Sequence, residues 1–167
     1  MWYAVYTRSR FEKKVEEKLI EKKIDVFLPT IKKLRQWKDR KKWITIPLFN
    51  NYIFVNIDYK DRYSILETDG IVKFITFQGK PVPIPFNQID SLKIAISEPE
   101  KVNVEPGIAI GKPVIVTAGP FKGIKGIISE KRGQNLIHIV IESINQSVSI
   151  DIHSGMIEPL ENESKKK

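Results

Sequence analysis

The chain has 167 residues, of which 41% are hydrophobic and 29% charged, and it carries a net charge of +8 and no cysteine. This size allows one ordinary domain or two small ones, and the lack of cysteine excludes disulfide and thiol chemistry. No apolar run approaches the roughly 20 residues of a membrane helix, and the first residues lack a signal-peptide pattern. We therefore expect a cytoplasmic protein without a membrane partner.

The first two elements are predicted from residue type and helical spacing. The segment WYAVYT (2–7) is aromatic and β-branched enough to form a strand. Ser9 followed by Glu12 has the spacing of a capping box, which marks the start of a helix. Because Phe11, Val15 and Leu19 then recur at helical spacing, we expect a helix of about four turns with one buried stripe.

The rest of the first half alternates strands with short helices. A helix introduced by Asp58 and Asp61 is predicted over 60–68, with Tyr63 and Leu66 on one side. Another helix is predicted to end the segment 81–96, after three prolines. Strands are predicted over 25–37, 42–49, 51–57 and 71–77. Since the first two of these strands read as a hairpin, the pattern predicts an α+β fold with a mainly antiparallel sheet.

Composition changes sharply at SEPEKVNVEPG (97–107), which we predict to be a linker. Beyond it, short Ile- and Val-rich strands broken by turn residues are typical of a small barrel. Gly119, Gly123 and Gly126 are expected to supply positive φ in its tight turns. The predicted organisation is a domain over 1–96, a linker over 97–107, a barrel over 108–160 and a disordered tail over 161–167.

The excess positive charge lies entirely in the first half. Residues 1–96 contain 19 Lys+Arg against 11 Asp+Glu, whereas residues 97–167 contain nine of each. The block KKLRQWKDRKK (32–42), predicted as the loop of the hairpin, has seven basic residues and one acidic residue. Such a block attracts polyanions, above all nucleic acid. The alternative is a solvated loop whose charges serve only solubility.

The segment PLFNNYIFV (47–55) has large apolar side chains on both faces of a predicted strand. Ile53 and Val55 point to one side, and Tyr52 and Phe54 point to the other. Both faces therefore need cover. Either the C-terminal helix of the same domain covers the aromatic face, or a partner protein binds there.

Catalytic chemistry is not indicated. His138 and His153 are the only histidines, and both lie in alternating strand patterns where a surface or half-buried histidine is the ordinary explanation. The start of a helix accounts for Asp58 and Asp61. No ligand spacing suggests a metal, and no glycine-rich phosphate loop follows a strand. We expect neither enzyme activity nor a cofactor.

Several motifs occur in the order of a known family. GPFKGIKG (119–126), with Val116 before it, resembles a KOW motif, which opens a small SH3-like barrel. Upstream, WYAVYTRSRFEKKVEEKL, PLFNNYIFV, GIVKFI and GKPVPI are similar to successive parts of the NGN domain. Together they resemble the NusG family of transcription elongation factors over almost the whole chain. LRQWKDRKKWITIPLF further resembles the specialised UpxY-like and RfaH-like paralogues.

The resemblance implies an NGN-like domain that binds the β′ clamp helices of RNA polymerase through an apolar cavity. Matched by position, that cavity would be lined by Tyr6, Tyr52, Phe54 and Phe77. A second polymerase contact would fall on Arg62, Tyr63 and Ser64, although their chemistry differs from that of the family motif. Contacts to upstream or non-template DNA would come from Arg8, Arg10, Lys38, Arg40, Lys41 and Lys42.

The barrel in this family recruits other machinery, either a small-subunit ribosomal protein or Rho. The matching partner contacts here would be Phe121 and Ile144, with strand packing as the alternative for Ile144. Fourteen Ile or Val residues between 114 and 152 favour strands, so we predict a barrel that does not refold as helices. The predicted function is that of a monomeric elongation or antitermination factor. The alternatives are a standalone nucleic-acid- or ribosome-binding module and, third, an assembly or scaffold role.

Overall fold

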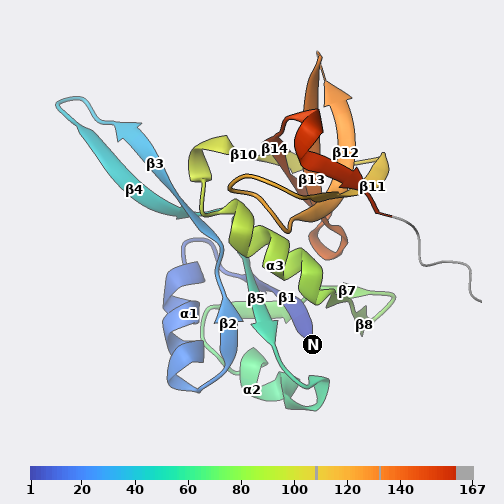
Figure 1. The fold of residues 1–167 in the computed structure, drawn as a ribbon. Helices are drawn as coiled ribbons and strands as arrows, with labels where there is room; N and C mark the ends of the chain where they lie inside the picture. Colours follow the sequence, from blue (N-terminus) through green and yellow to red (C-terminus); the bar gives the residue numbers. More distant parts are fainter. Residues whose placement is uncertain (108, 132, 161–167) are drawn as a thin grey trace, which may run out of the picture. The chain divides into compact units, whose positions relative to one another are not determined.

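The computed structural model describes residues 1–107, 109–131 and 133–160 (Figure 1). The chain forms two compact units that divide between residues 86 and 87, and each unit is described by itself. The predicted disordered tail over 161–167 lies outside the described residues. Among the helices of the described ranges, none is long and apolar enough to cross a membrane.

The first unit is built on an antiparallel sheet with β1 (Trp2–Thr7) at its centre. β1 pairs with β5 (Tyr52–Asn56) and β6 (Ile71–Phe74), and also with the short β9 (Pro83–Ile84). β2 (Asp25–Phe27) extends the sheet by pairing with β5. The predicted antiparallel α+β fold is therefore confirmed.

One face of this sheet forms the main core of the first unit. Alternate residues of β1 and β5 point toward this core, which also contains Val15 and Leu19 of α1 (Glu12–Glu21) and Ile65 of α2 (Arg62–Leu66). The predicted buried stripe of α1 is thus confirmed. A 3₁₀ turn, η1 (Tyr59–Asp61), precedes α2. Here Ile65 is fully buried, whereas Tyr63 and Leu66, predicted to share one side of this helix, are both exposed. The helix is also shorter than the predicted 60–68.

The predicted capping box at the start of α1 is wrong. No side chain caps this helix, and its N-cap residue is Phe11. Glu12 is instead buried, and its Oε1 accepts a hydrogen bond from the backbone N–H of Asn51 at 2.8 Å. Asn51 has a left-handed backbone (φ 68°) and also donates its side-chain amide to Thr7 O. Glu12 therefore anchors the turn before β5 rather than its own helix.

A two-stranded hairpin, β3 (Thr30–Gln36) and β4 (Lys41–Pro47), extends from the first unit (Figure 1). Most of the basic block 32–42, described above as the loop of this hairpin, lies in the two strands, and the connection is only residues 37–40. The strand predicted over 25–37 is divided into β2 and β3, and the strand predicted over 42–49 corresponds to β4. The predicted strand over 71–77 is also divided, into β6 and β7 (Thr76–Phe77), and β7 pairs with β8 (Lys80–Pro81).

The second unit contains most of α3 (Phe86–Ala95) and an antiparallel sheet of six strands. The hydroxyl of Ser91 on α3 accepts a hydrogen bond from the backbone N–H of Lys125 at 3.1 Å. The strand order is β10–β14–β13–β12–β11–β15. These strands are β10 (Val102–Pro106), β11 (Lys112–Val116), β12 (Lys125–Lys131), β13 (Gln134–Ile141), β14 (Gln146–Asp151) and β15 (Ile157–Pro159), with 3₁₀ turns η2 (Pro99–Lys101), η3 (Glu142–Ile144) and η4 (Ser154–Met156).

The predicted linker over 97–107 differs from what the structure forms there. Residues 102–106 make β10, which pairs along its whole length with β14. Val102 is buried, so this segment belongs to the sheet despite its charges and prolines. The division of the chain also falls before most of α3 rather than after it.

The β-rich character predicted for the second unit is confirmed, and strands occupy residues 112–116, 125–131, 134–141 and 146–151. Gly119 and Gly123 have the expected positive φ, at 78° and 97°. Gly126 does not. A Cβ at that position would lie 2.5 Å from the backbone oxygen of His138, so this glycine permits the close approach of β12 and β13.

Candidate partner-binding surfaces

An aromatic face lies on the side of the sheet opposite the α1 core. Tyr6 of β1 stands directly across from Tyr52 of β5, and their ring centroids are 5.4 Å apart at an interplanar angle of 74°. Further along β5, Phe54 stacks on Phe27 of β2 at 6.2 Å and meets the edge of Phe49 at 6.1 Å. The sequence prediction that Tyr52 and Phe54 share one side of a strand is confirmed, and the face carries two groups of contacting rings, one around Tyr52 and one around Phe54.

Exposure differs along this aromatic face. Phe54 is 0% exposed, whereas Tyr6 and Tyr52 are half-buried. Partial burial raises the pKa of the Tyr52 hydroxyl, and the nearby Tyr6 adds to this effect, so Tyr52 presents a neutral phenol. The tyrosine end is therefore the part of the face that a partner can touch.

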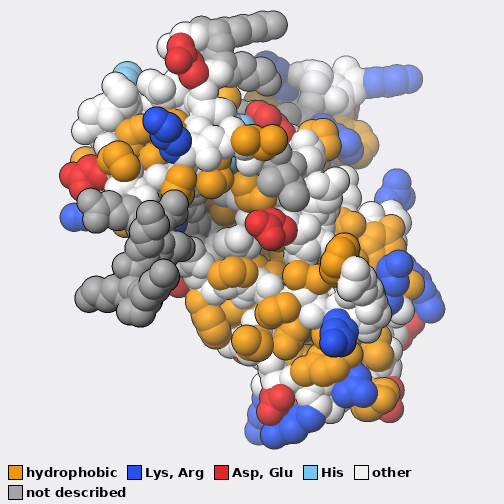
Figure 2. Space-filling view, turned by 90° about the vertical axis from the view of Figure 1, so that its right-hand side faces the viewer, with side chains coloured by type: hydrophobic (Ala, Val, Ile, Leu, Met, Phe, Trp, Pro, Cys, Tyr) orange, Lys and Arg blue, Asp and Glu red, His pale blue; other side chains and the backbone are white. Residues whose placement is uncertain are grey.

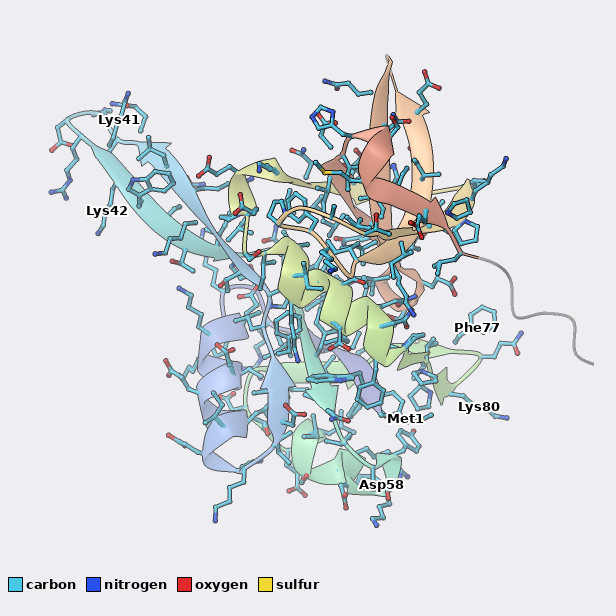
Figure 3. All side chains as sticks on the ribbon, viewed as in Figure 1. Met1, Lys41, Lys42, Asp58, Phe77 and Lys80 are labelled. Carbon is cyan, nitrogen blue, oxygen red and sulfur yellow. The ribbon has the colours of Figure 1, made fainter. Side chains whose placement is uncertain are left out.

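Phe77 lies apart from the other three predicted cavity residues. It is on β7 in a separate two-stranded sheet, is 69% exposed, and projects from the β7–β8 hairpin (Figure 3). Within the described residues, no ring contact joins it to Tyr6 or Tyr52. Hydrophobic side chains gather at the surface of the first unit on this side, in the lower part of Figure 2. Phe77 is an exposed apolar anchor beside the sheet rather than a wall of one closed cavity.

The predicted second polymerase contact forms its own local cluster. The Arg62 guanidinium lies 4.6 Å from the ring centroid of Tyr59 and 4.2 Å from that of Tyr63. Arg62 also donates to the Tyr63 hydroxyl at 2.8 Å, and Ser64 Oγ donates to the backbone oxygen of Asp61. Tyr63 is 60% exposed. Arg62 and Tyr63 are in direct contact, and Tyr63 is the exposed large apolar side chain of the three.

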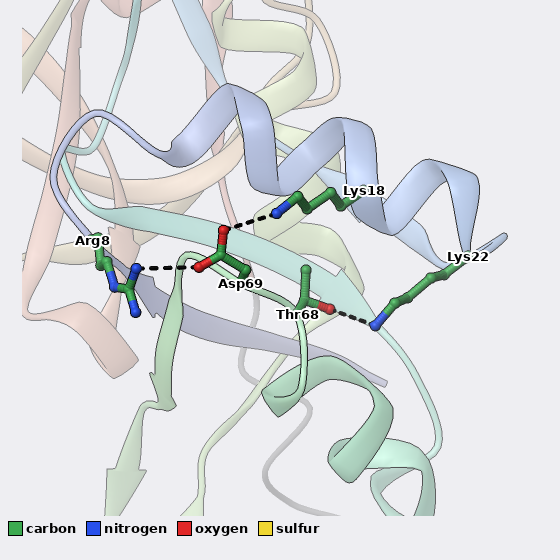
Figure 4. Close-up of polar contacts among 5 residues, drawn as sticks. All are labelled: Arg8, Lys18, Lys22, Thr68 and Asp69. Atoms are coloured by element: carbon green, nitrogen blue, oxygen red, sulfur yellow. Dashed lines mark hydrogen bonds and ion pairs between the residues drawn. The ribbon is translucent and has the colours of Figure 1, made fainter.

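Arg8, predicted to bind nucleic acid, is engaged in an ion-pair network (Figure 4). Its Nη1 lies 3.2 Å from Asp69 Oδ1, and Lys18 Nζ lies 3.0 Å from Asp69 Oδ2. Lys18 is the larger cause of the lowered pKa of the Asp69 carboxyl. Beside it, Lys22 donates to Thr68 Oγ1 at 2.9 Å. This network ties α1 and the end of β1 to the turn before β6.

The other predicted nucleic-acid-binding residues are exposed cations. Lys38, Arg40, Lys41 and Lys42 all lie at the outer end of the β3–β4 hairpin (Figure 3). Arg10 is separate from them and borders a groove of about 560 Å³ at the base of the hairpin. The groove is lined by Ser9, Arg10, Glu12, Lys13, Arg35, Ile46, Pro47, Asn50 and Asn51.

Sequence reasoning missed most of this groove. Arg35, Lys13 and Asn50 were not singled out, because residues from three separate segments line the groove together. One signal was available in the sequence. Alternation along the second strand places Arg35 on the same side as Ile31 and Lys33.

In the second unit, the two predicted partner contacts are both buried. Phe121 is 4% exposed and Ile144 is 7% exposed. Lys101 Nζ lies 5.6 Å from the centre of the Phe121 ring. Phe121 also borders a groove of about 330 Å³, together with Pro120, Ile152 and Met156. Any contact through Phe121 would be made at the floor of this groove.

The histidines occupy ordinary positions. His138 is buried on β13, with Nε2 2.7 Å from Ser129 Oγ, and His153 is exposed beside η4. Across the residues that the structure describes, no group of His, Asp and Glu side chains is placed to hold a metal ion.

The two units, with an aromatic sheet face, a basic hairpin and a β-rich second unit, define a class of protein that works through surfaces offered to other macromolecules. The family model described as transcription termination factor nusG matches residues 1–93. Because this is more than half of the chain, the protein belongs to the NusG family.

Curated relatives agree with this assignment. The chain is 23% identical to the transcription termination/antitermination protein NusG of Staphylococcus carnosus over 175 residues, covering 95% of each chain. It is 21% identical to the protein of the same name from Lactococcus lactis, covering 96% of this chain and 93% of the relative. A solved structure of Thermotoga maritima NusG is 23% identical, covers 96% of this chain and 97% of its own, and superposes with a TM-score of 0.48.

The protein is thus a transcription termination/antitermination factor of the NusG family. Members of this family are transcription factors rather than enzymes, in agreement with the prediction from the sequence. The narrower resemblance to the UpxY-like and RfaH-like paralogues stays a prediction.

Proposed function

We propose that the first unit docks on the β′ clamp helices of RNA polymerase through its aromatic face, and thereby suppresses pausing or termination. The observation that supports this is the half-buried pair Tyr6 and Tyr52. Aromatic side chains with one apolar face open to solvent are the usual anchors of protein interfaces. The exposed Phe77 provides a further anchor on the same unit. A factor that prefers the closed clamp over the open clamp would shift polymerase toward its pause-resistant state.

In this proposal Phe54 is a packing residue of the first unit that supports the docking surface. Its ring holds Phe27 and Phe49 in place and is fully buried. Tyr63 on α2 would make the weaker contact to a second part of polymerase, since it is the exposed aromatic side chain among Arg62, Tyr63 and Ser64.

The second unit would recruit a second partner, a small-subunit ribosomal protein or Rho. The groove above Phe121 is the surface that supports this part of the proposal, because Ile152 and Met156 give it apolar walls. Tethering on one chain would hold that partner close to polymerase at high effective concentration.

The docking experiment uses purified full-length protein and core RNA polymerase in a pull-down and an affinity titration. Tyr52→Ala and Phe77→Ala are expected to weaken binding by roughly tenfold each, because truncation of an interface anchor typically costs about 1–3 kcal/mol. Ile20→Ala is the matched control. Ile20 is 58% exposed on α1, which packs on the opposite face of the sheet.

The titration also separates docking from the alternative of a standalone nucleic-acid-binding module. Docking predicts that Tyr52→Ala loses polymerase while keeping its affinity for oligonucleotides. If polymerase binding is unchanged in both Tyr52→Ala and Phe77→Ala, the proposed docking face is wrong.

A further inference from the structure

One segment of the second unit reaches both residues that were predicted to contact a partner there. Phe121 and Ile144 are both buried. Lys101 Nζ lies 5.6 Å from the centre of the Phe121 ring, and Lys101 also borders the groove above that ring. At the other end of the segment, the backbone N–H of Gly107 donates to the carbonyl oxygen of the residue after Ile144 at 2.9 Å. We call residues 98–107, which contain η2 and β10, the strap.

Between these two ends, the strap occupies the edge of β14. β10 pairs with β14 from Val102 opposite Ile150 to Pro106 opposite Gln146, and it is the terminal strand of the six-stranded order. The backbone groups on this side of β14 are therefore covered by a segment of the same chain. An uncovered strand edge is a template for pairing with another chain. A partner strand can pair with β14 here only when β10 has left.

The strap is held by few side-chain contacts. Of the five residues of β10, Val102 alone is buried, whereas four of the six residues of β14 are buried. Val104 is 40% exposed. The Ser149 hydroxyl donates to Glu105 Oε1 at 2.8 Å, and Pro106 has no N–H to donate to the ladder. Segments with little buried apolar surface open at low free energy while the rest of the domain stays folded.

The composition of the strap favours its release. Its sequence, EPEKVNVEPG, contains three glutamates and two prolines, so the free segment is well solvated and loses little apolar burial. Its one ion pair joins Lys101 Nζ to Glu98 Oε2 at 3.3 Å, and both side chains are exposed. Exposed pairs of this kind contribute little to stability. The segment therefore suits both a solvated linker and an edge strand.

We propose that the strap is releasable, and that its release opens a surface of the second unit that binds an extended strand of a partner protein. With the strap closed, Lys101 covers Phe121 and β10 occupies the β14 edge. With the strap open, the partner strand pairs with β14 and places a β-branched side chain opposite Ile150, where Val102 lies now. The partner is a peptide segment because the edge offers alternating backbone donors and acceptors, which an extended chain matches.

This inference rests on the proposed recruitment of a partner by the second unit, and it adds the regulation of that surface. The strap competes with the partner from within the same chain. The apparent affinity of the partner is therefore reduced by the fraction of molecules in which the strap is open. A strap that is open in about 1% of molecules weakens binding about 100-fold.

The first test uses the full-length chain and a labelled synthetic peptide of sequence EPEKVNVEPG, and follows binding by fluorescence anisotropy. Val102→Asp places a charge at the buried position, so it should release the strap and strengthen peptide binding by about tenfold or more. Asn103→Asp adds the same charge at an exposed position of β10 and should bind the peptide as weakly as the unaltered chain. Equal peptide binding by all three chains would overturn the proposal.

Hydrogen exchange followed by mass spectrometry tests the strap without a variant that disturbs the core. Residues 102–106 should exchange roughly 100-fold faster than the central strand β13, because they open locally. Exchange of both segments at one rate would mean that the strap opens only when the whole unit unfolds, and the proposal would be wrong.

A disulfide lock provides the matched control for this exchange measurement. The chain has no cysteine, and Asn103 stands directly opposite Ser149, a geometry whose Cα separation of about 4.5–5.5 Å a disulfide can bridge. In Asn103→Cys/Ser149→Cys, oxidation should slow the exchange of residues 102–106 about tenfold or more, and reduction should restore it. Exchange that is equally fast in the oxidised and reduced forms contradicts the release of β10 from β14.

Failure of this inference and failure of the proposed recruitment give different results, because the peptide and exchange tests use no partner. A strap that opens, in a chain whose reduced lock variant captures neither small-subunit ribosomal proteins nor Rho, overturns recruitment alone. A strap that does not open, in a chain whose oxidised and reduced lock variants capture the partner equally, overturns the strap alone.

Discussion

Replacing Phe54 with alanine should destabilise the first unit rather than merely weaken a partner interface. The ring is 0% exposed and contacts Phe27 and Phe49, with centroid distances of 6.2 and 6.1 Å. Phe→Ala substitutions in packed cores cost about 3–5 kcal/mol, through lost burial and the cavity left behind. A domain of ordinary stability has about 5–15 kcal/mol in total. Phe54→Ala is therefore expected to leave the first unit marginally folded.

The assay is urea unfolding of the full chain followed by tryptophan fluorescence. All three tryptophans, Trp2, Trp37 and Trp43, lie in the first unit, so the signal reports on that unit alone. Trp2 is 3% exposed and lies 6.5 Å from Phe27, which makes it sensitive to the aromatic face. Because this fluorescence comes from the first unit, the unfolding transition of that unit can be fitted without that of the second unit.

Tyr52→Ala is the comparison for Phe54→Ala. Tyr52 is on the same strand face but half-buried, so its loss should be well below that of Phe54, about 1 kcal/mol. If Phe54→Ala also loses less than about 1 kcal/mol, the ring is not packed as a core residue in solution. In that case the reasoning that limits docking to the tyrosine end of the face fails.

Substitutions at Asp69, Gly126 and Glu12, with a control for each of the last two, test the supports of the fold. Asp69→Asn should lower Tm at pH 7, because Lys18 holds the pKa of the Asp69 carboxyl below its usual range. That contribution is present above the usual carboxyl pKa and is lost as the pH falls through the lowered pKa of the folded state, so the Tm difference should shrink on acidification below the usual Asp pKa of about 3.9. Gly126→Ala should destabilise the second unit by about 1–3 kcal/mol, because the new Cβ would lie 2.5 Å from a backbone oxygen. Gly155→Ala, with open space around it, should leave the unfolding midpoint seen by calorimetry unchanged. Glu12→Ala should cost about 1.5–3 kcal/mol in urea unfolding by stranding a buried N–H, and Glu12→Gln should cost less.

Local patterns were sufficient to predict the central elements of the first unit. Aromatic and β-branched residue types identified β1, alternation identified the two faces of β5, and the i, i+4 spacing of Val15 and Leu19 identified the buried side of α1. These signals are reliable because the strand and helix periods fix which side chains share a face.

Predictions that depended on distant residues were less successful. Ser9 and Glu12 have the spacing of a capping box, but the half-buried backbone N–H of Asn51, 39 residues away, uses the Glu12 carboxylate. Residues 97–107 look like a linker in composition, yet Val102 and Val104 alternate as in a strand, and β14 supplies the pairing partner. In both cases the tertiary partner outweighs the local preference.

The candidate sites show the same division between local and distant information. Residue type alone grouped Lys41 with Lys42, whereas the strand geometry separates them by face. Arg35 lines one groove with Arg10 and Asn50, which come from other segments of the chain. A basic segment in a sequence indicates nucleic acid, but the register of the hairpin decides which cations share a face.

The aromatic face of β5 now has two parts with different roles. At the Phe54 end, burial and ring stacking make the side chains part of the fold. At the Tyr52 end, the rings of Tyr52 and Tyr6 are held edge to face but remain half-buried. An interface anchor requires a side chain that is packed rigidly on one side and open to solvent on the other, since little conformational entropy is then lost on binding. In the proposed function, the same strand would therefore stabilise the unit with one residue and present a preorganised docking surface two residues away.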